Sequence, residues 1–101
     1  MRSLQTLMRK LVLARCRCDI LTRPLLEARA RRGDAVDADP REEREGRAHL
    51  RASLAELRIT QELYRELVAD FRAVCGPRHA YTVEAQQGLA KMGHLAQLAT
   101  A

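Results

Sequence analysis

The three cysteines of this 101-residue chain could in principle bind a metal ion, but their spacing does not suit one. One residue separates Cys16 from Cys18, whereas zinc sites use cysteine pairs separated by about two to four residues. On a helix, residues two apart point to nearly opposite sides, so the two thiols cannot grip the same ion. We therefore predict no metal site and no cofactor. An odd number of cysteines without a secretory context, Cys75 being the third, is typical of reduced thiols in a cytoplasmic protein.

The candidate bases and nucleophiles form no constellation typical of catalysis. Both serines lie in ordinary helical surroundings without a base or an oxyanion site. His79 follows Gly-Pro-Arg at a predicted helix start, a position that suits a helix cap better than a general base. Glu62, Glu66 and Asp70 share one helical side with arginines, which is typical of a solvated ion-pair surface. We predict no catalytic residue and expect that the protein is not an enzyme.

The basic residues are concentrated at the start of the chain. Residues 1–33 hold nine positive and two negative side chains, net +7, and residues 34–47 hold three positive and six negative, net −3. This pattern favours charges that neutralise each other within a small fold. The alternative is a nucleic-acid or anionic-surface contact through the basic residues Arg9, Lys10, Arg15 and Arg17. The first 18 residues also fit a membrane-surface helix or a transit peptide, although they contain no aromatic residue.

Apolar residues that recur every three or four positions indicate that helices position all of these side chains. A first helix over residues 3–22 has a stripe of Leu4, Leu7, Met8, Leu11, Ala14, Cys18 and Leu21. Pro24 then either starts a second helix over residues 24–32 or kinks the first one. After an acidic loop, residues 34–40, the run Asp39-Pro40-Arg41-Glu42 combines an aspartate cap, a proline in the first turn and a capping box. A strong helix is predicted to begin there.

The next helix is predicted to be long, because the sequence has no proline between Pro40 and Pro77. Its apolar seam is Leu50, Leu54, Leu57, Gln61, Tyr64, Val68, Phe71 and Cys75, and a second stripe beside it is Ile59, Leu63, Leu67 and Val74. Gly76 and Pro77 end this helix at residue 75. A four-residue turn then lays a last helix, residues 80–98, antiparallel on it.

These elements predict an all-α fold of three to four helices with a long central helix. No stretch alternates with period two and no hairpin dipeptide occurs, so we predict no strands. The length fits a single helical domain over residues 1–101. Within it, residues 1–33 form a basic helical segment, 34–40 an acidic loop, and 41–101 the long helix with its antiparallel C-terminal helix.

The turn and the last helix resemble the tetratricopeptide repeats of the kinesin light chain type, which are common in bacterial repeat proteins. The matching residues are Leu63-Tyr64 and then Gly76, Pro77, His79, Thr82, Leu89 and Ala90, whereas Ala80 replaces the usual proline. The resemblance covers about a third of the chain. It implies helical pairs that stack into a scaffold for other proteins or peptides without catalysis of their own, and a structural role for the turn residues Gly76, Pro77, His79 and Thr82.

The resemblance bears on two of the predicted helix boundaries, and at the second it disagrees with the periodicity. The run Pro-Leu-Leu-Glu-Ala after Arg23 resembles the start of a repeat helix, which favours a new helix at Pro24. The family also implies a turn near Arg58 to Thr60, where Thr60 could cap a new helix, but no Gly, Pro or Asn occurs there. We interpret residues 40–75 as one continuous helix and keep the broken helix as the alternative.

The function predicted from these features is a protein–protein interaction or assembly module in the cytoplasm. One short partner helix cannot cover two apolar stripes, so we predict a homodimer or a stack with a larger repeat protein. The predicted partner-binding residues are Leu50, Leu54, Leu57, Ile59, Leu63, Tyr64, Leu67 and Phe71. The longest apolar run of the first helix, Leu11 to Ala14, is too short to span a membrane. Nucleic-acid or anionic-surface binding through the basic N-terminal helix is the alternative function.

Overall fold

Three α-helices make up the fold in a computed structural model that describes residues 3–33 and 39–100. They are α1 (Leu4–Gly33), α2 (Pro40–Cys75) and α3 (Ala80–Thr100). No strand occurs in the two described ranges, so the predicted all-α class is confirmed, together with the long central helix.

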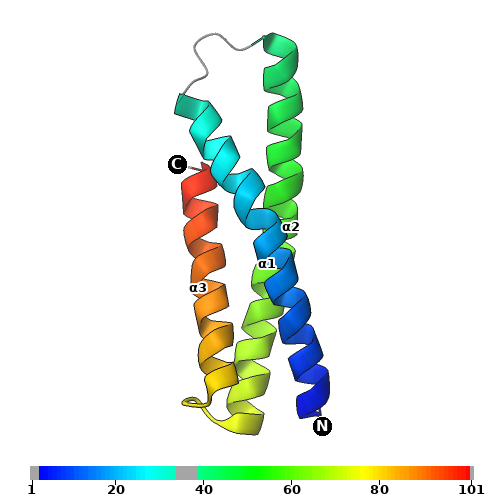
Figure 1. The fold of residues 1–101 in the computed structure, drawn as a ribbon, viewed down its shortest axis with the longest axis vertical. Coiled ribbons are helices and arrows are strands. Elements are labelled where there is room, and N and C mark those ends of the chain that lie inside the picture. Colours follow the sequence, from blue (N-terminus) through cyan, green and yellow to red (C-terminus); the bar gives the residue numbers. More distant parts are fainter. Residues whose placement is uncertain (1–2, 34–38, 101) are drawn as a thin grey trace.

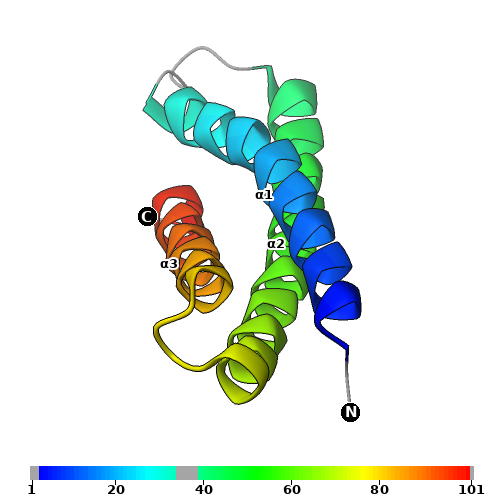
Figure 2. The ribbon, with the colours of Figure 1, turned by 60° about the horizontal axis from the view of Figure 1, so that its bottom comes forward.

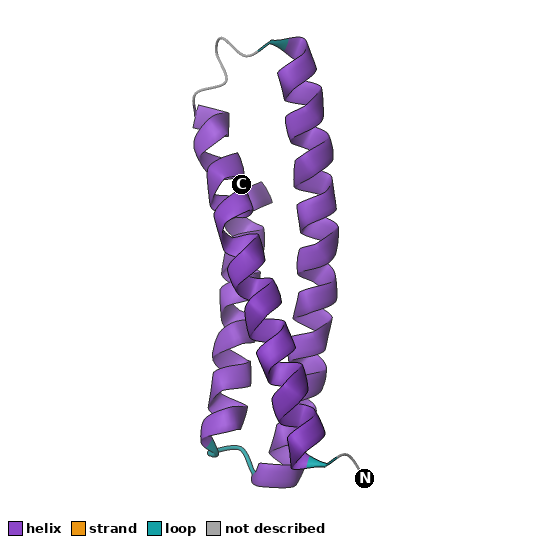
Figure 3. Cartoon of the chain, turned by 45° about the vertical axis from the view of Figure 1, so that its right-hand side comes forward, coloured by secondary structure: helices purple, strands orange, loops and turns teal. Residues whose placement is uncertain are grey.

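The helices run up, down and up, so that α2 is antiparallel to both of its neighbours (Figure 1). Each helix contacts the other two. The molecule measures 53 × 19 × 14 Å, and 36 residues at about 1.5 Å per residue give α2 that same full length. The shorter α3 covers only part of α2, as Figure 3 shows from another side.

The core joins all three helices into one apolar cluster. Its buried members are Leu7, Leu11, Ala14, Cys18, Leu21 and Leu25 of α1, Leu57, Tyr64, Leu67 and Phe71 of α2, and Ala85, Met92, Leu95 and Ala99 of α3. In α2 the fully buried residues begin only at Ser53, and Leu50 is the one hydrophobic residue before it that packs, half-buried, against the core. The core therefore lies beside the second half of α2.

α1 continues through Pro24, and the separate helix predicted for residues 24–32 is wrong. The alternative, a kinked helix, is confirmed, because Figure 2 shows α1 bending between its blue first half and its cyan second half. Proline lacks the N–H that would bond the carbonyl of Ile20 four residues earlier. Ile20 is 71% exposed, so water can reach this side of the helix. The bend keeps Leu21 and Leu25 buried on the opposite side, and this burial outweighs the lost hydrogen bond.

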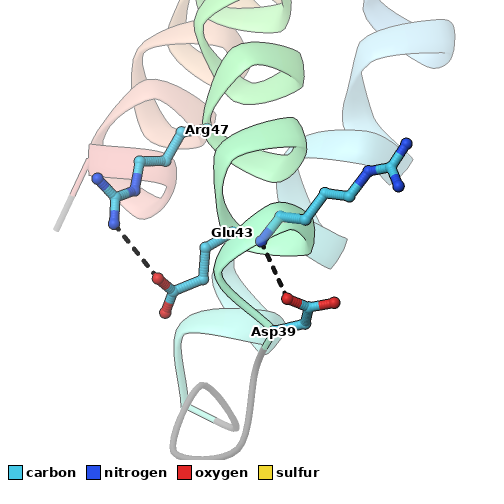
Figure 4. Close-up of polar contacts among 4 residues, drawn as sticks. Asp39, Glu43 and Arg47 are labelled. Atoms are coloured by element: carbon cyan, nitrogen blue, oxygen red, sulfur yellow. Dashed lines mark hydrogen bonds and ion pairs between the residues drawn. The ribbon is translucent and has the colours of Figure 1, made fainter.

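α2 begins as predicted, at the Asp39 cap. The Asp39 carboxylate accepts a hydrogen bond from the Arg41 N–H at 3.2 Å, and its carbonyl accepts one from the Glu43 N–H at 3.0 Å. Glu42 and Glu43 put negative charge in the first turn, where the helix dipole is positive. Glu43 also pairs with Arg47 at 3.5 Å, as Figure 4 shows beside the cap.

α2 then runs unbroken past residue 58, so the continuous helix is confirmed and the turn implied by the family resemblance is wrong. Thr60 is fully buried, and its hydroxyl donates to the Glu56 carbonyl at 2.9 Å. Bonded in this way, Thr60 is an interior helix residue and not the cap of a new helix. Leu57 and Tyr64 are both buried in the same core, and an unbroken helix places both side chains on that face.

The turn after α2 has the form that its residues predict. Gly76 adopts φ +90° and ψ 163°, and its N–H donates to the Arg72 carbonyl at 3.1 Å. The positive φ suits glycine, and Pro77 favours the extended ψ of the residue before it. The Thr82 hydroxyl donates to the Gly76 carbonyl at 2.8 Å, while His79 Nδ1 accepts from the Tyr81 N–H at 3.2 Å. His79 is therefore a helix cap, as predicted.

α3 approaches α2 closely at a single glycine. A Cβ atom built on Gly88 would overlap the ring of Tyr64. A Cβ atom built on Gly46 or Gly93 would instead lie in open space. The buried tyrosine ring thus packs directly on the backbone of α3. This contact fixes how deeply the two helices interlock.

Candidate interaction surface

The predicted partner-binding residues of α2 lie mainly inside the chain. Leu57, Tyr64, Leu67 and Phe71 are at most 2% exposed, so in this fold they cannot contact a partner. Leu50, Leu54 and Leu63 are half-buried and pack against the same core, and only Ile59 is exposed, at 53%. The prediction failed for the buried four because α1 is one helix of 30 residues and, with α3, covers the apolar sides of α2.

The apolar surface that remains open lies on α1. Every fourth residue from Leu4 to Ile20 is apolar and exposed, and we call this row the outer ridge: Leu4 39%, Met8 37%, Val12 55%, Cys16 and Ile20 71%. Leu13, 48% exposed, lies beside it. The predicted first stripe therefore needs a correction, because Leu4 and Met8 belong to this ridge and not to the core.

α1 is thus apolar on two sides. One side holds the buried residues from Leu7 to Leu25, and the outer ridge lies on the side away from α2 and α3. An exposed apolar row on a helix whose other side is already buried is a candidate contact surface, although charged residues such as Arg9, Arg15 and Asp19 lie around it. The signal was present in the sequence as the four-residue spacing of Met8, Val12, Cys16 and Ile20. Sequence reasoning missed this ridge because it assigned a single apolar stripe to the first helix.

The four predicted anion-binding residues do not form one open basic patch. Arg15 pairs with Glu84 of α3 at 3.2 Å, and Arg17 pairs with Glu56 of α2 at 3.7 Å. Arg9 is exposed and lines a shallow depression of about 390 Å³ with Gln5, Met8 and Val12, and Lys10 is half-buried. The predicted neutralisation within the fold therefore occurs at Arg15 and Arg17, with partners outside the acidic loop. Such exposed pairs contribute roughly 0–1 kcal/mol each.

A second depression lies between α1 and α3. It has a volume of about 520 Å³, is widely open, and is lined by Asp19, Thr22, Arg23, Leu26, Glu27, Ala30 and Lys91. Arg23 and Glu27, one turn apart on α1, form an ion pair at 3.2 Å in the lining of this depression. Charges of both signs face an open surface here, and no base–nucleophile pair is among the lining residues.

Chemically reactive groups are dispersed over the part of the chain that the structure describes. Within residues 3–33 and 39–100, no three His, Cys, Asp or Glu side chains lie together in a way that could hold a metal ion. Cys16 is exposed, Cys18 buried and Cys75 half-buried, all as free thiols. Burial raises the pKa of Tyr64 to about 12, and the nearby Cys18, Asp19 and Glu84 act in the same direction. In the same ranges, no helix is long and apolar enough to cross a membrane.

Comparisons with protein-family models, with curated proteins and with solved structures found no match to this chain. The resemblance to kinesin-light-chain-type repeats therefore stays a prediction that depends on Leu63-Tyr64 of α2 and on the residues of the turn and of α3.

Proposed function

We propose that this chain is a non-catalytic, TPR-like helical module that assembles with another protein chain in the cytoplasm. The observation that carries the proposal is the outer ridge of α1, an apolar row left exposed on a helix whose opposite side is already in the core. Contiguous apolar patches on a protein surface commonly mark sites of interaction with other molecules.

The energetics favour a partner for this ridge. Full burial of an aliphatic side chain is worth about 1.5–3 kcal/mol, so covering a row of half-exposed residues gains several kcal/mol in total. Single exposed apolar residues elsewhere, such as Val74 and Val83, form no comparable row and need no partner. The family resemblance adds support, since repeats of that type bind proteins or peptides.

The experiment is a pull-down from the native cell, in which the purified wild-type chain and two matched variants are used to capture partner proteins. Val12→Glu places a charge in the middle of the outer ridge, and Ile59→Glu does the same on α2 at nearly equal exposure, 53% against 55%. We expect that protein captured by the wild type is lost with Val12→Glu and kept with Ile59→Glu. Equal capture by all three chains would contradict the proposal.

Binding to an anionic partner is distinguished by its dependence on salt. Phosphate contacts weaken steeply as salt rises, because binding releases condensed counterions, whereas an apolar interface changes little. Since Arg15 and Arg17 are paired within the chain, we expect capture to persist from low to moderate salt. A steep loss over that range would favour the nucleic-acid or anionic-surface alternative.

A further inference from the structure

We propose that the outer side of α2 carries a second interaction surface, which binds an acidic α-helix of a partner protein. Five arginines at intervals of seven residues form this surface, and we call them the arginine row: Arg44, Arg51, Arg58, Arg65 and Arg72. All five are exposed. The inference goes beyond the proposed function, because it concerns a different helix from the outer ridge and does not depend on it.

The arginine row lies along one side of α2, because seven residues are nearly two helical turns. It drifts by about 20° per heptad and spans about 42 Å at 1.5 Å per residue. Glu56 pairs with Arg17 of α1, and it lies two residues before Arg58, so these two α2 side chains point to nearly opposite sides. The row is therefore on the side of α2 away from α1. α3, with 21 residues against 36 in α2, leaves every arginine of the row exposed.

The positive charge of the row is mostly unpaired within the chain. Arg65 pairs with Glu62 at 3.2 Å, whereas none of the acidic side chains in residues 3–33 and 39–100 forms an ion pair with the other four arginines. Glu84, the one acidic residue of α3, pairs with Arg15 of α1. A row of cations that the fold itself does not neutralise favours an anionic partner.

The seven-residue interval is the interval at which paired helices repeat their contacts. In such pairs, charged side chains along the edge of the contact form salt bridges between the helices. The arginine row occupies such an edge, because each arginine from Arg51 onward is followed three residues later by a half-buried residue: Leu54, Gln61, Val68 and Cys75. Three of these four, all but Gln61, pack against the core. A partner helix with glutamates at the same interval can therefore place carboxylates beside the guanidinium groups, which they bind in bidentate geometry.

A nucleic acid fits the row less well. The strands of a DNA duplex wind once in about 34 Å, so a straight row of about 42 Å cannot follow the phosphates of either strand. Proteins that bind single strands stack the bases on exposed aromatic side chains. Here Tyr64 and Phe71 are buried and Tyr81 is half-buried.

An anionic membrane and a second copy of the chain are also less suitable. Glu62 lies between Arg58 and Arg65 on the same side of α2, and Glu66 lies beside it, so a uniformly anionic surface would meet carboxylates there. A partner helix can avoid this repulsion by placing a neutral or basic residue opposite Glu62. Two copies that met through this surface would bring arginines against arginines, and like charges repel.

Fluorescence anisotropy with two labelled synthetic peptides tests the spacing. The row-matched peptide has one glutamate and, three residues later, one leucine in each of its heptads, and the control peptide has the same composition with its glutamates spread around the helix. For the full chain at low salt we expect a dissociation constant on the order of 10–100 µM for the row-matched peptide and about tenfold weaker binding of the control. Equal affinities, or no binding of the row-matched peptide up to about 1 mM, would overturn the inference.

Charge reversal tests the position of the surface. The double variant Arg51→Glu with Arg58→Glu should lose binding of the row-matched peptide by at least about tenfold. The control variant is Arg9→Glu with Arg23→Glu, which has the same net charge and changes exposed residues of α1, and it should bind like the wild type. Circular dichroism must show the same helix content for all three chains. Equal loss in both variants would show that only net charge matters and would overturn the inference.

A charge exchange and two competitors complete the test. A row-matched peptide with lysine in place of glutamate should bind the double variant of α2 more tightly than it binds the wild type, and the reverse order would contradict the pairing. The competitors are a DNA oligonucleotide and vesicles of phosphatidylcholine with phosphatidylserine. Tighter binding of either one, lost when Arg51 and Arg58 are reversed, would overturn the choice of a protein helix as the partner.

The proposed function is read separately, through Val12. Val12→Glu should leave binding of the row-matched peptide unchanged, because the outer ridge and the arginine row lie on different helices. If the peptides fail to bind but Val12→Glu still loses a captured protein, the arginine row is not an interaction surface and the proposed function stands. If the peptides bind as expected and capture does not depend on Val12, the outer ridge fails and the arginine row stands.

Discussion

At the residue scale, Gly88 is a position where the fold leaves no room for a side chain. Adding a methyl group there forces the Tyr64 ring away from the α3 backbone, so Gly88→Ala should destabilise the fold by about 1–3 kcal/mol. Gly93→Ala, in the same helix but with open space around it, should instead stabilise by about 0.5–1 kcal/mol, because alanine loses less backbone entropy. Urea unfolding followed by circular dichroism measures both. Equal effects would show that Tyr64 does not pack on Gly88.

Tyr64 also predicts how stability depends on alkaline pH. In the unfolded chain the phenol loses its proton near the ordinary pKa of about 10. In the folded chain burial raises the pKa of Tyr64 to about 12. Between these values the unfolded state binds fewer protons, so the free energy of unfolding falls as pH rises from 10 to 12, by at most about 2–3 kcal/mol. Below pH 10 the phenol is protonated in both states, and its full contribution to the free energy of unfolding is present.

Tyr64→Phe supplies the control for that pH dependence. The difference in unfolding free energy between wild type and Tyr64→Phe should be constant up to about pH 10 and should shift in favour of the phenylalanine variant above it. Denaturant titrations at a series of pH values measure this difference. A difference that stays flat through pH 12 would show that the phenol is not buried in the folded state.

At the scale of elements, two buried threonines play different parts. The Thr82 hydroxyl bridges α3 to the Gly76 carbonyl in the turn, whereas Thr60 bonds the Glu56 carbonyl within its own helix. Thr82→Val should therefore cost about 1–2 kcal/mol, because the turn carbonyl loses its shortest bond. Thr60→Val should cost less, since the Glu56 carbonyl keeps its backbone partner in the helix. Thermal unfolding compares the two, and a more harmful Thr60→Val would contradict this account of the turn.

Elements whose limits depend on neighbouring residues could be predicted from the sequence. Asp39-Pro40 begins α2 and Gly76-Pro77 ends it, because a cap or a forced φ acts within one turn of the chain. The continuity of α2 was predictable for the same reason, since no residue near 58 offers a turn conformation.

The effect of Pro24 on the helix could not be predicted from the neighbouring residues. Whether a proline starts a helix or bends one depends on what the next turn can bury, and Leu25 is held by residues far away in the chain. The position of the candidate surface was predicted wrongly for the same reason. Leu57 and Phe71 have the sequence pattern of an interface, and only the path of α1 decides that they are core and that Val12 and Ile20 are surface.

At the scale of the whole molecule, the homodimer that the sequence predicts should be visible in thermal stability. A dimer that forms only between folded chains stabilises them by mass action, so the melting temperature should rise with concentration. For a domain of this size we expect several degrees over about a hundredfold range of wild-type concentration. Val12→Glu should melt at one temperature throughout. A concentration-independent wild type would argue against a dimer that is populated at these concentrations.

None of the first thirteen residues of α2 is fully buried, although the helix continues through them, and Leu50 near their end is the one hydrophobic residue that packs against the core. The residues before Leu50 are held by the Asp39 cap and by the ion pairs Arg41–Glu45 and Glu43–Arg47, and each ion pair contributes a few tenths of a kcal/mol. This segment should fray without disturbing the bundle, so its amide hydrogens will exchange with solvent long before those of residues 57–71. α2 is then one continuous helix whose two halves unfold separately. Gly46→Ala should therefore slow amide exchange in the first half alone.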